Sequence, residues 1–257
     1  MFSKILRIFI ISLTFLAVMS STQAKDIEKN DQLARVALIT AKDGHDKALE
    51  DAIVKYHKFV SNKKGSWRYD WFSIETGPDT GKYIARSGSH NWADFDAEHD
   101  WDKEAGEKFN KWVAPHIADF KVSITQTDMK VGKWPKDIKG YNYFLLSKWH
   151  IKSGKSEAFK EGLKKVDGIL KEGGWPNYYS FVDTVSGGHG NTKLLVSPRK
   201  NFADMGPKEP KFMDILKKAM GEKEAGTFMK EWGMTYKNGD YWMVKHLPRH
   251  SDYGDKK

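Results

Sequence analysis

The chain has 257 residues and no cysteine, and its 43 Lys and Arg residues outnumber its 34 Asp and Glu residues, for a formal net charge of +9. The lack of cysteine excludes disulfides, thiol nucleophiles, cysteine-ligated clusters and a lipid-modified cysteine. The positive charge comes mostly from lysines spread along the whole length, without an arginine cluster or a basic helix face, so we expect no nucleic-acid partner.

The first 24 residues have the layout of a cleavable secretory signal peptide. Lys4 and Arg7 precede an apolar run from Ile8 to Met19, and small and polar residues follow. The run is shorter than the roughly 20 residues that span a bilayer, so we expect no integral membrane segment after cleavage. We therefore predict a mature protein that begins near Lys25 and is periplasmic or secreted.

The first part of the mature chain has a β-α-β-β-α-β pattern. An apolar strand is expected at residues 34–41, and the helix after it has one buried face, with apolar residues at the i, i+4, i+7, i+11 spacing: Leu49, Ile53, Tyr56 and Val60. An aromatic-rich strand at 65–75 and the run KYIARS form a hairpin around a glycine-containing turn. A second helical region and a strand near 120–126 complete the unit.

The same pattern recurs about 110 residues later. A strand at 142–150 and the helix after it match the first strand and helix, and Asn201 and Asp204 repeat Asn91 and Asp94. The chain therefore divides into a signal peptide, a polar lead-in, a first repeat, a linker, a second repeat and a polar tail, at residues 1–24, 25–33, 34–129, 130–140, 141–247 and 248–257. The tail has the composition of a disordered terminus.

This order of elements predicts an α+β fold made of two tandem ferredoxin-like repeats. Each repeat would form an antiparallel sheet with helices on one face, leaving the other face bare. Because a bare apolar face has to be covered, we expect the two repeats to close their sheets against each other into an intrachain barrel.

The run SKWHIKSGKSEAFKEGL, from Ser147 to Leu163, is similar to the strand-loop-helix opening of the dimeric α+β barrel superfamily. That superfamily includes antibiotic-biosynthesis-type monooxygenases, haem-degrading monooxygenases and NIPSNAP-like proteins. The resemblance covers nearly all of the mature sequence at the level of pattern. It implies two ferredoxin-like halves closed into a barrel, here within one chain, and it leaves the chemistry open.

His150 is the candidate catalytic residue. Alternation along its strand puts Trp149 and Ile151 under the helices and turns Lys148 and His150 toward the barrel. The strand order of a ferredoxin-like sheet would bring three polar side chains close to this histidine: Asp183, Lys193 and Tyr241. Such a group would serve as a general base or as a ligand of a metal or of haem iron. The alternative is a buried histidine held by structural hydrogen bonds.

Aromatic residues in the second strand of each repeat are the candidate ligand-binding residues. Tyr69 and Trp71 fall on one face of the first repeat, and Tyr179 and Phe181 fall on the matching face of the second. If that face lines the barrel, these rings and Lys148 enclose a box for a flat apolar or aromatic molecule. The alternative is a solid aromatic core.

The segment HNWADFDAEHDWD is the candidate for metal binding, since imidazoles and carboxylates together suit zinc or manganese. Its histidines, His90 and His99, are absent from the matching segment of the second repeat. Asn91 and Asp94 do recur there, and such residues are favoured at helix starts. We therefore expect a capping role, with no metal, and keep the two histidines as weak alternatives.

Motifs of dinucleotide-binding proteins, P-loop proteins, zinc proteases and nucleophile-elbow hydrolases are absent from the sequence. We expect a protein that binds a small apolar or aromatic molecule in the barrel, as a monomer or homodimer, with no cofactor predicted. The first alternative is a cofactor-free monooxygenase-like or haem-handling enzyme that uses His150. The second is a structural or stress-related envelope protein. The sequence does not decide whether the protein is an enzyme.

Overall fold

The computed structural model describes residues 32–251. The predicted signal peptide, most of the polar lead-in and residues 252–257 of the predicted tail lie outside the described residues, so the structure does not test them. No helix within residues 32–251 is long and apolar enough to cross a membrane.

Two copies of the predicted pattern follow each other along the described chain. The strands of the first copy are β1 (Leu33–Ala41), β2 (Asp70–Thr76), β3 (Tyr83–His90) and β4 (Ile117–Lys133). Those of the second copy are β5 (Tyr143–Ile151), β6 (Tyr179–Ser186), β7 (Thr192–Arg199) and β8 (Tyr236–His246). The strand β4 is longer than expected, since it continues into the predicted linker.

The helices are α1 (Asp46–Val60) and α2 (Asp102–Trp112) in the first copy, and α3 (Ser156–Glu172), α4 (Phe212–Met220) and α5 (Glu222–Gly233) in the second. Short 3-10 helices are η2 (Trp92–Asp96), η3 (Ala114–His116), η4 (Phe202–Met205) and η5 (Pro248–His250). The second copy therefore has two consecutive helices where the sequence predicted one helical region.

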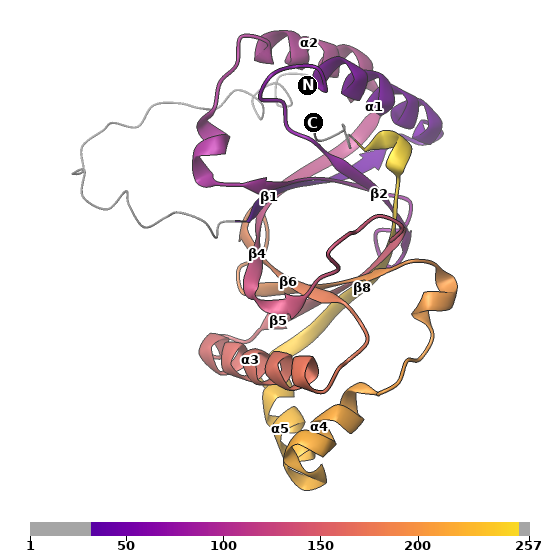
Figure 1. Ribbon diagram of the computed structural model, residues 1–257. Helices are drawn as coiled ribbons and strands as arrows, with labels where there is room; N and C mark the ends of the chain where they lie inside the picture. Colours follow the sequence, from indigo (N-terminus) through magenta and orange to yellow (C-terminus); the bar gives the residue numbers. More distant parts are fainter. Residues whose placement is uncertain (1–31, 252–257) are drawn as a thin grey trace, which may run out of the picture.

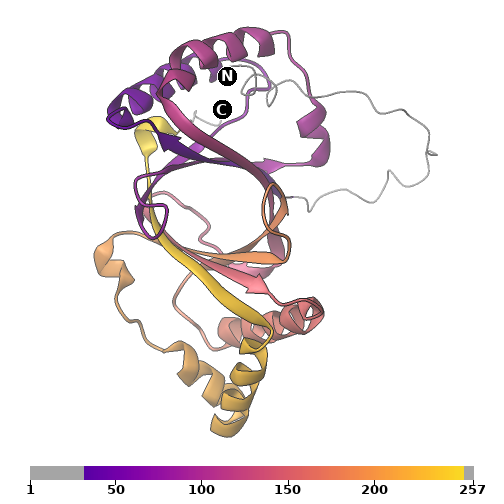
Figure 2. The ribbon, with the colours of Figure 1, turned by 180° about the vertical axis from the view of Figure 1, so that it is seen from behind.

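The strands of the described chain form one closed antiparallel barrel in the order β1-β3-β2-β8-β5-β7-β6-β4. Each copy contributes four neighbouring strands, and two pairings join the copies, β2 with β8 and β4 with β6. The barrel lies in the middle of the molecule, with α1 and α2 on one side and α3, α4 and α5 on the opposite side (Figures 1 and 2). The prediction of tandem ferredoxin-like repeats closed into an intrachain α+β barrel is confirmed.

The outer face of each half of the barrel is buried under its own helices. In the first copy, Leu49 and Ile53 of α1 share a buried cluster with Ala37 and Ile39 of β1. In the second copy, a matching cluster contains the expected apolar positions of α3, namely Phe159, Leu163, Val166 and Leu170. Burial of this apolar face, at about 25 cal/mol per Å², holds each helix layer on its sheet.

Apolar side chains also occupy the interior of the barrel. A third buried cluster contains Ile74, Phe144, Leu146, Trp242 and Val244, with partly buried Leu38, Phe72, Ile84, Leu194 and Val196 packed against it. Ile138 of the linker and Tyr141, at the start of the second repeat, pack against the same cluster. These inward-facing residues lie in the space in which the sequence predicted a ligand box.

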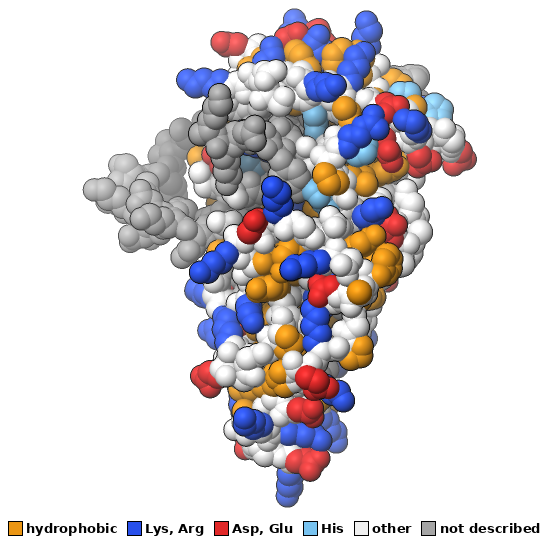
Figure 3. All heavy atoms as spheres, turned by 45° about the vertical axis from the view of Figure 1, so that its right-hand side comes forward, with side chains coloured by type: hydrophobic (Ala, Val, Ile, Leu, Met, Phe, Trp, Pro, Cys, Tyr) orange, Lys and Arg blue, Asp and Glu red, His pale blue; other side chains and the backbone are white. Residues whose placement is uncertain are grey.

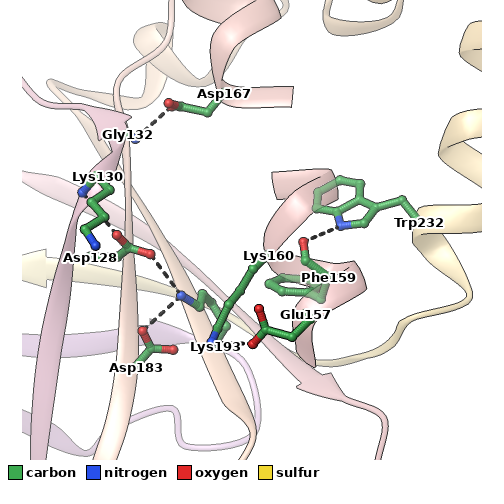
Figure 4. A network of polar contacts seen from close by, with 10 residues as sticks. All are labelled: Asp128, Lys130, Gly132, Glu157, Phe159, Lys160, Asp167, Asp183, Lys193 and Trp232. Carbon is green, nitrogen blue, oxygen red and sulfur yellow. Dashed lines mark hydrogen bonds and ion pairs between the residues drawn. The ribbon is translucent and has the colours of Figure 1, made fainter. Parts of the chain in front are cut away.

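Asp167 is a buried carboxylate that ties α3 to the sheet (Figure 4). It accepts hydrogen bonds from the backbone N–H of Gly132 at 2.8 Å and from the hydroxyl of Tyr179 at 2.9 Å, and it pairs with Lys171 at 2.7 Å. Because a buried carboxylate is costly unless it is hydrogen-bonded, the bonds from Gly132 and Tyr179 fix the position of α3 against β4 and β6, while Lys171 of α3 itself neutralises the charge.

The predicted caps are confirmed at two 3-10 helices. At η2 the side chain of Asn91 accepts a hydrogen bond from the backbone N–H of Asp94, and the Asp94 carboxylate accepts one from the N–H of Asn91. At η4 the Asn201 side chain accepts from the N–H of Asp204. The repeated Asn and Asp therefore serve local structure, since each pair satisfies an N–H group at a helix start.

The start of the predicted tail belongs to the folded part of the protein. Pro248–His250 forms η5, which packs against α1, and His250 is only 6% exposed. The predicted polar tail therefore begins with a folded segment, in which the buried His250 lies 3.4 Å from Glu50 of α1.

The charged side chains are spread over the surface. On the face shown in Figure 3, Lys and Arg side chains alternate with Asp and Glu side chains and with small apolar patches, and they do not merge into one basic area.

Gly162 of α3 lies against the Trp232 side chain of α5. A Cβ atom added there would lie 2.2 Å from Cδ1 of Trp232, whose Nε1 donates a hydrogen bond to the carbonyl of Phe159 at 3.0 Å. An added Cβ at Gly168, on the same helix, would have no atom within 4 Å. The two glycines therefore differ in packing within the same helical environment.

We expect Gly162→Ala to lower the free energy of unfolding by about 1–3 kcal/mol, because the indole of Trp232 has to move. The matched change Gly168→Ala should raise it by about 0.5–1 kcal/mol, since only the helix preference of alanine acts there. Urea denaturation followed by tryptophan fluorescence measures both. Equal effects of the two changes would contradict the packing described here.

Candidate functional site

A cavity of about 90 Å³ lies between α1, α2 and the outer face of the first repeat's sheet. We call it the helix–sheet cavity. Its walls are mainly apolar and aromatic, with an arginine, a histidine and two tyrosines among them: Arg35, Ala37, Ile39, Ile53, Tyr56, His57, Tyr69, Trp71, Ala85, Phe109, Val113 and Phe120.

Small side chains on two neighbouring strands leave room for the cavity. Ala37 of β1 and Ala85 of β3 are register partners, and they share a face with Ile39. At the equivalent places of the second repeat, about 110 residues later, stand Ser147, Leu195 and Trp149. Trp149 packs there against Phe159 and Trp232, with ring centroids 5.9 Å away in both cases. The second repeat is therefore filled where the first is hollow.

His57 and Trp71 form a polar contact at the cavity wall. The indole Nε1 of Trp71 donates a hydrogen bond to Nε2 of His57 at 3.2 Å. Since an indole N–H only donates, Nε2 must be the unprotonated nitrogen of a neutral imidazole, which places the ring proton on Nδ1. This contact fixes the orientation of the histidine beside the cavity.

The tyrosines of the cavity stay protonated at neutral pH. Burial raises the pKa of Tyr56 to about 12, and the neighbouring Tyr69 acts in the same direction. Burial also raises the pKa of Tyr69, although the Arg35 guanidinium beside its hydroxyl opposes the shift. The cavity thus presents a fixed positive charge and neutral phenol groups within apolar walls.

The structure places the aromatic ligand-binding candidates on the face that the helices cover. Tyr69 and Trp71 lie on the helix-covered face and line the helix–sheet cavity. Tyr179 and Phe181, each 3% exposed, lie in the solid helix-covered core of the second repeat. None of the four lines the barrel interior, because Trp71 is in register with Ala85, which faces the helices.

Lys148 is on the barrel side, as the alternation predicted. Its Nζ lies 4.5 Å from the ring centroid of Trp242 and 3.5 Å from a carboxylate oxygen of Asp240. Trp149 and Ile151 pack under the helices, also as predicted. The assumed strand alternation is therefore correct at β5.

The predicted group of His150, Asp183 and Tyr241 does not come together. Asp183 is in register with Lys193, which is in register with Trp149, so all three belong to the helix-covered face. His150 is in register with Thr192, on the opposite face. Tyr241 is opposite Ser147 on the same side as Trp149 and is 54% exposed. Opposite faces of one sheet separate His150 from the two residues proposed to assist it.

Asp183 instead takes part in an ion pair across the join between the repeats (Figure 4). Lys193 is 4% exposed, and its Nζ lies 2.9 Å from Asp183 and 3.3 Å from Asp128. Asp128 belongs to β4 of the first repeat, so the buried lysine joins strands of both copies. These contacts give Asp183 a structural role in the described fold.

Arg35 and His57 were missed from the sequence. Arg35 interrupts the apolar strand ARVALITA at a position that shares a face with Ala37 and Ile39, and an arginine on the buried face of a strand is unusual. His57 follows the apolar position Tyr56 on α1. Each is an ionisable residue on a face predicted to be apolar, and this feature would have identified both as candidates from the sequence.

The metal candidates each contact an indole ring. His90 stacks on Trp67 with ring centroids 4.1 Å apart and bonds through Nε2 to Ser87 at 2.7 Å, while His99 stacks on Trp101 at 4.9 Å. No group of three or more metal-ligating side chains occurs within residues 32–251. The two histidines are thus held by packing and hydrogen bonds.

Haem does not fit beside His57 or His150. A porphyrin needs an open slot and an axial ligand. Nε2 of His57 accepts the Trp71 hydrogen bond, and the cavity beside it is smaller than the roughly 300–1,000 Å³ of sites for larger ligands. The ring of His150 packs over Gly239, where even a Cβ atom would lie 2.8 Å from Nε2.

No protein-family model matches the sequence, and neither does any curated protein. Several solved structures share the fold. A Lactobacillus acidophilus protein provisionally assigned as a monooxygenase matches with a TM-score of 0.51 and 12% identity, over 88% of this chain and 100% of that chain. A Fusobacterium nucleatum protein with the same provisional assignment matches with a TM-score of 0.53 and 12% identity, over 85% and 93%.

A chlorite dismutase mutant from Candidatus Nitrospira defluvii matches with a TM-score of 0.50 and 7% identity, over 90% of this chain and 97% of that chain. Together these structures show that the chain has the dimeric α+β barrel fold, as the resemblance at Ser147 to Leu163 implied. At such low identity, the likeness establishes the fold alone.

Burial lowers the pKa of three histidines, His90, His246 and His250, because it disfavours their charged form. In the unfolded chain they titrate near pH 6.5. Below that pH the unfolded state binds more protons, so their contribution to stability is complete above about pH 6.5 and is lost as the pH falls toward the folded-state values.

We expect the urea midpoint to decrease from about pH 7.5 to about pH 5.5, and to decrease less in His246→Asn. The exposed His189 supplies the control, since His189→Asn should leave the pH dependence unchanged. An identical pH dependence in wild type and His246→Asn would show that burial of His246 does not contribute.

Proposed function

We propose that the protein binds a small, single-ring aromatic molecule with a hydroxyl group, of the phenol or quinol class, in the helix–sheet cavity. The observation that carries the proposal is the hollow itself, which lies in the first copy where the larger side chains of Trp149 and Leu195 stand in the second. Its apolar walls with a few polar groups are typical of small-molecule sites.

The lining suits a phenol more than an aliphatic ligand. Rings of Tyr56, Trp71 and Phe109 offer edges and faces to a flat molecule. Arg35 and Tyr69 offer a cation and a neutral hydroxyl to an oxygen on that ring. An apolar cavity of roughly 150 Å³ takes benzene, so this cavity of about 90 Å³ has to widen by side-chain movement to admit one ring.

Monooxygenase-like oxidation of the bound ring is the second candidate function. Two solved structures of the same fold are provisionally assigned as monooxygenases. The neutral His57 is the group beside the cavity that would accept a proton from a hydroxyl, after giving up its hydrogen bond with Trp71. Binding requires no such rearrangement, so it is the function that the geometry supports better.

We expect hydroquinone to bind the mature protein with one site per chain in isothermal titration. Ala85→Leu, which introduces the side chain found at Leu195 of the second repeat, should reduce the affinity at least tenfold by filling the cavity. Tyr69→Phe should weaken binding by a smaller factor through loss of one hydroxyl. Ala219→Leu, an equal enlargement at an exposed helix position, is the matched control.

Oxygen uptake measured in the same samples separates the two candidate functions. Hydroquinone binding without uptake beyond a protein-free blank supports a binding protein, and uptake that is lost in Ala85→Leu supports the monooxygenase-like reaction. Binding that Ala85→Leu leaves unchanged would place the ligand elsewhere and exclude both proposals for this cavity.

The proposed ligand would be met outside the cytoplasm, because we propose that residues 1–24 direct export. In a Gram-negative host, the protein released by osmotic shock should have the mass of a chain starting at Lys25. Leu13→Arg, a charge within the apolar run, should block export, and Ser3→Arg, a charge before it, should not. A full-length cytoplasmic product from the wild-type gene would contradict the export proposal.

A further inference from the structure

A second hollow, of about 260 Å³, lies at one end of the second repeat and is separate in sequence and lining from the helix–sheet cavity. It combines two tyrosine rings and two prolines with four charged side chains. Its lining residues are Tyr141, Pro176, Tyr178, Pro198, Arg199, Lys200, Asp204 and Lys208. Three of the charges are positive and one is negative, so the hollow has an excess of two positive charges.

Arg199 is held in place at one end of its guanidinium. Its Nη1 donates to the hydroxyl of Ser197 and to the carbonyl of Pro198, both at 2.8 Å, and the Ser197 hydroxyl donates to the carbonyl of Tyr178 at 2.6 Å. Among residues 32–251 the structure gives Nε and Nη2 no hydrogen bond. Three of the five donors of this rigid fork are therefore available to a ligand.

The negative charge of the hollow is already neutralised. Asp204 pairs with Lys208 and accepts a hydrogen bond from the backbone N–H of Lys200 at 2.9 Å. The Lys200 ammonium lies 5.7 Å from the ring centroid of Tyr141 and forms no ion pair within the described chain. Burial lowers the pKa of Arg199, since the charged form is disfavoured there, and a bound anion would offset that cost.

The walls of the hollow are flat and apolar. The rings of Tyr141 and Tyr178 meet edge to face with centroids 6.0 Å apart, and the pyrrolidine rings of Pro176 and Pro198 complete the lining. Aromatic and proline rings pack well against a planar ligand. A planar anion would thus meet apolar faces and the Arg199 fork together.

The first repeat fills the equivalent place. There His90, at the position of Lys200, stacks on Trp67 at 4.1 Å and meets Phe95 edge to face at 5.8 Å. A serine occurs at the same place in both copies. In the first copy Ser87 hydrogen-bonds to His90, and in the second copy Ser197 accepts a hydrogen bond from Arg199. The fold by itself does not require the hollow, because in the first repeat side chains occupy the equivalent place.

We propose that this hollow is a binding site for a small aromatic carboxylate. The carboxylate lies against the free donors of Arg199, in the two-oxygen geometry that a guanidinium fork matches, with Lys200 adding positive charge. The ring of the ligand lies against Tyr141 and Tyr178. This site does not depend on the function proposed for the helix–sheet cavity.

Benzoate and its neutral analogue benzamide are the probes. In isothermal titration of the mature protein we expect benzoate to bind, benzamide to bind at least tenfold more weakly, and the benzoate affinity to fall as salt is added. Arg199→Gln should lower the benzoate affinity at least tenfold, and Lys200→Gln should lower it by a smaller factor. Arg249→Gln removes an exposed arginine of η5, which pairs with Asp51 of the first repeat, and should have no effect.

Two further measurements keep the result unambiguous. The exposed Lys200→Gln reports on the site even if Arg199→Gln does not fold, which thermal unfolding reveals. The Ala85→Leu variant should bind benzoate like the wild type, because its filled cavity lies in the other repeat. The proposal is overturned if benzoate does not bind or if benzamide binds equally well. It is also overturned if Arg199→Gln and Lys200→Gln leave the affinity unchanged, or if Ala85→Leu abolishes benzoate binding.

Discussion

The open edges of two four-stranded sheets are the constraint on which the rest of the structure depends. Each sheet would expose the N–H and C=O groups of two edge strands, and such edges favour pairing with other strands. Here β2 pairs with β8 and β4 with β6, so that each copy covers the edges of the other. The buried Lys193, between Asp183 and Asp128, adds an ionic contact at the second of these joins.

Closure of the barrel also determines where a ligand can lie. It turns ten bulky apolar side chains inward and leaves the helices on the outside, so that open space depends on how well each helix layer fits its sheet. In the second copy Trp149 and Leu195 complete that fit, whereas Ala85 and its partner Ala37 leave it incomplete in the first. A difference of a few side-chain atoms separates a solid core from a cavity.

The repeat, the order of elements, the buried face of α1 and the Asn91 cap could be predicted, since each depends on local spacing. The inward or outward direction of Trp71 could not. Alternation divides a strand into two sets of side chains, but the register with neighbouring strands decides which set meets the helices. The same limit explains why His150 and Asp183 were expected together, and why Arg35 was passed over.

The fusion of the two copies has a consequence for the number of sites. In a barrel built from two identical chains, a two-fold axis would repeat every substitution, so that Ala85 and Arg199 would each occur in both halves. Linking the halves in one chain removes that symmetry and lets each copy change alone. One chain can thereby carry two unlike hollows, one on each repeat, while its scaffold stays nearly symmetric.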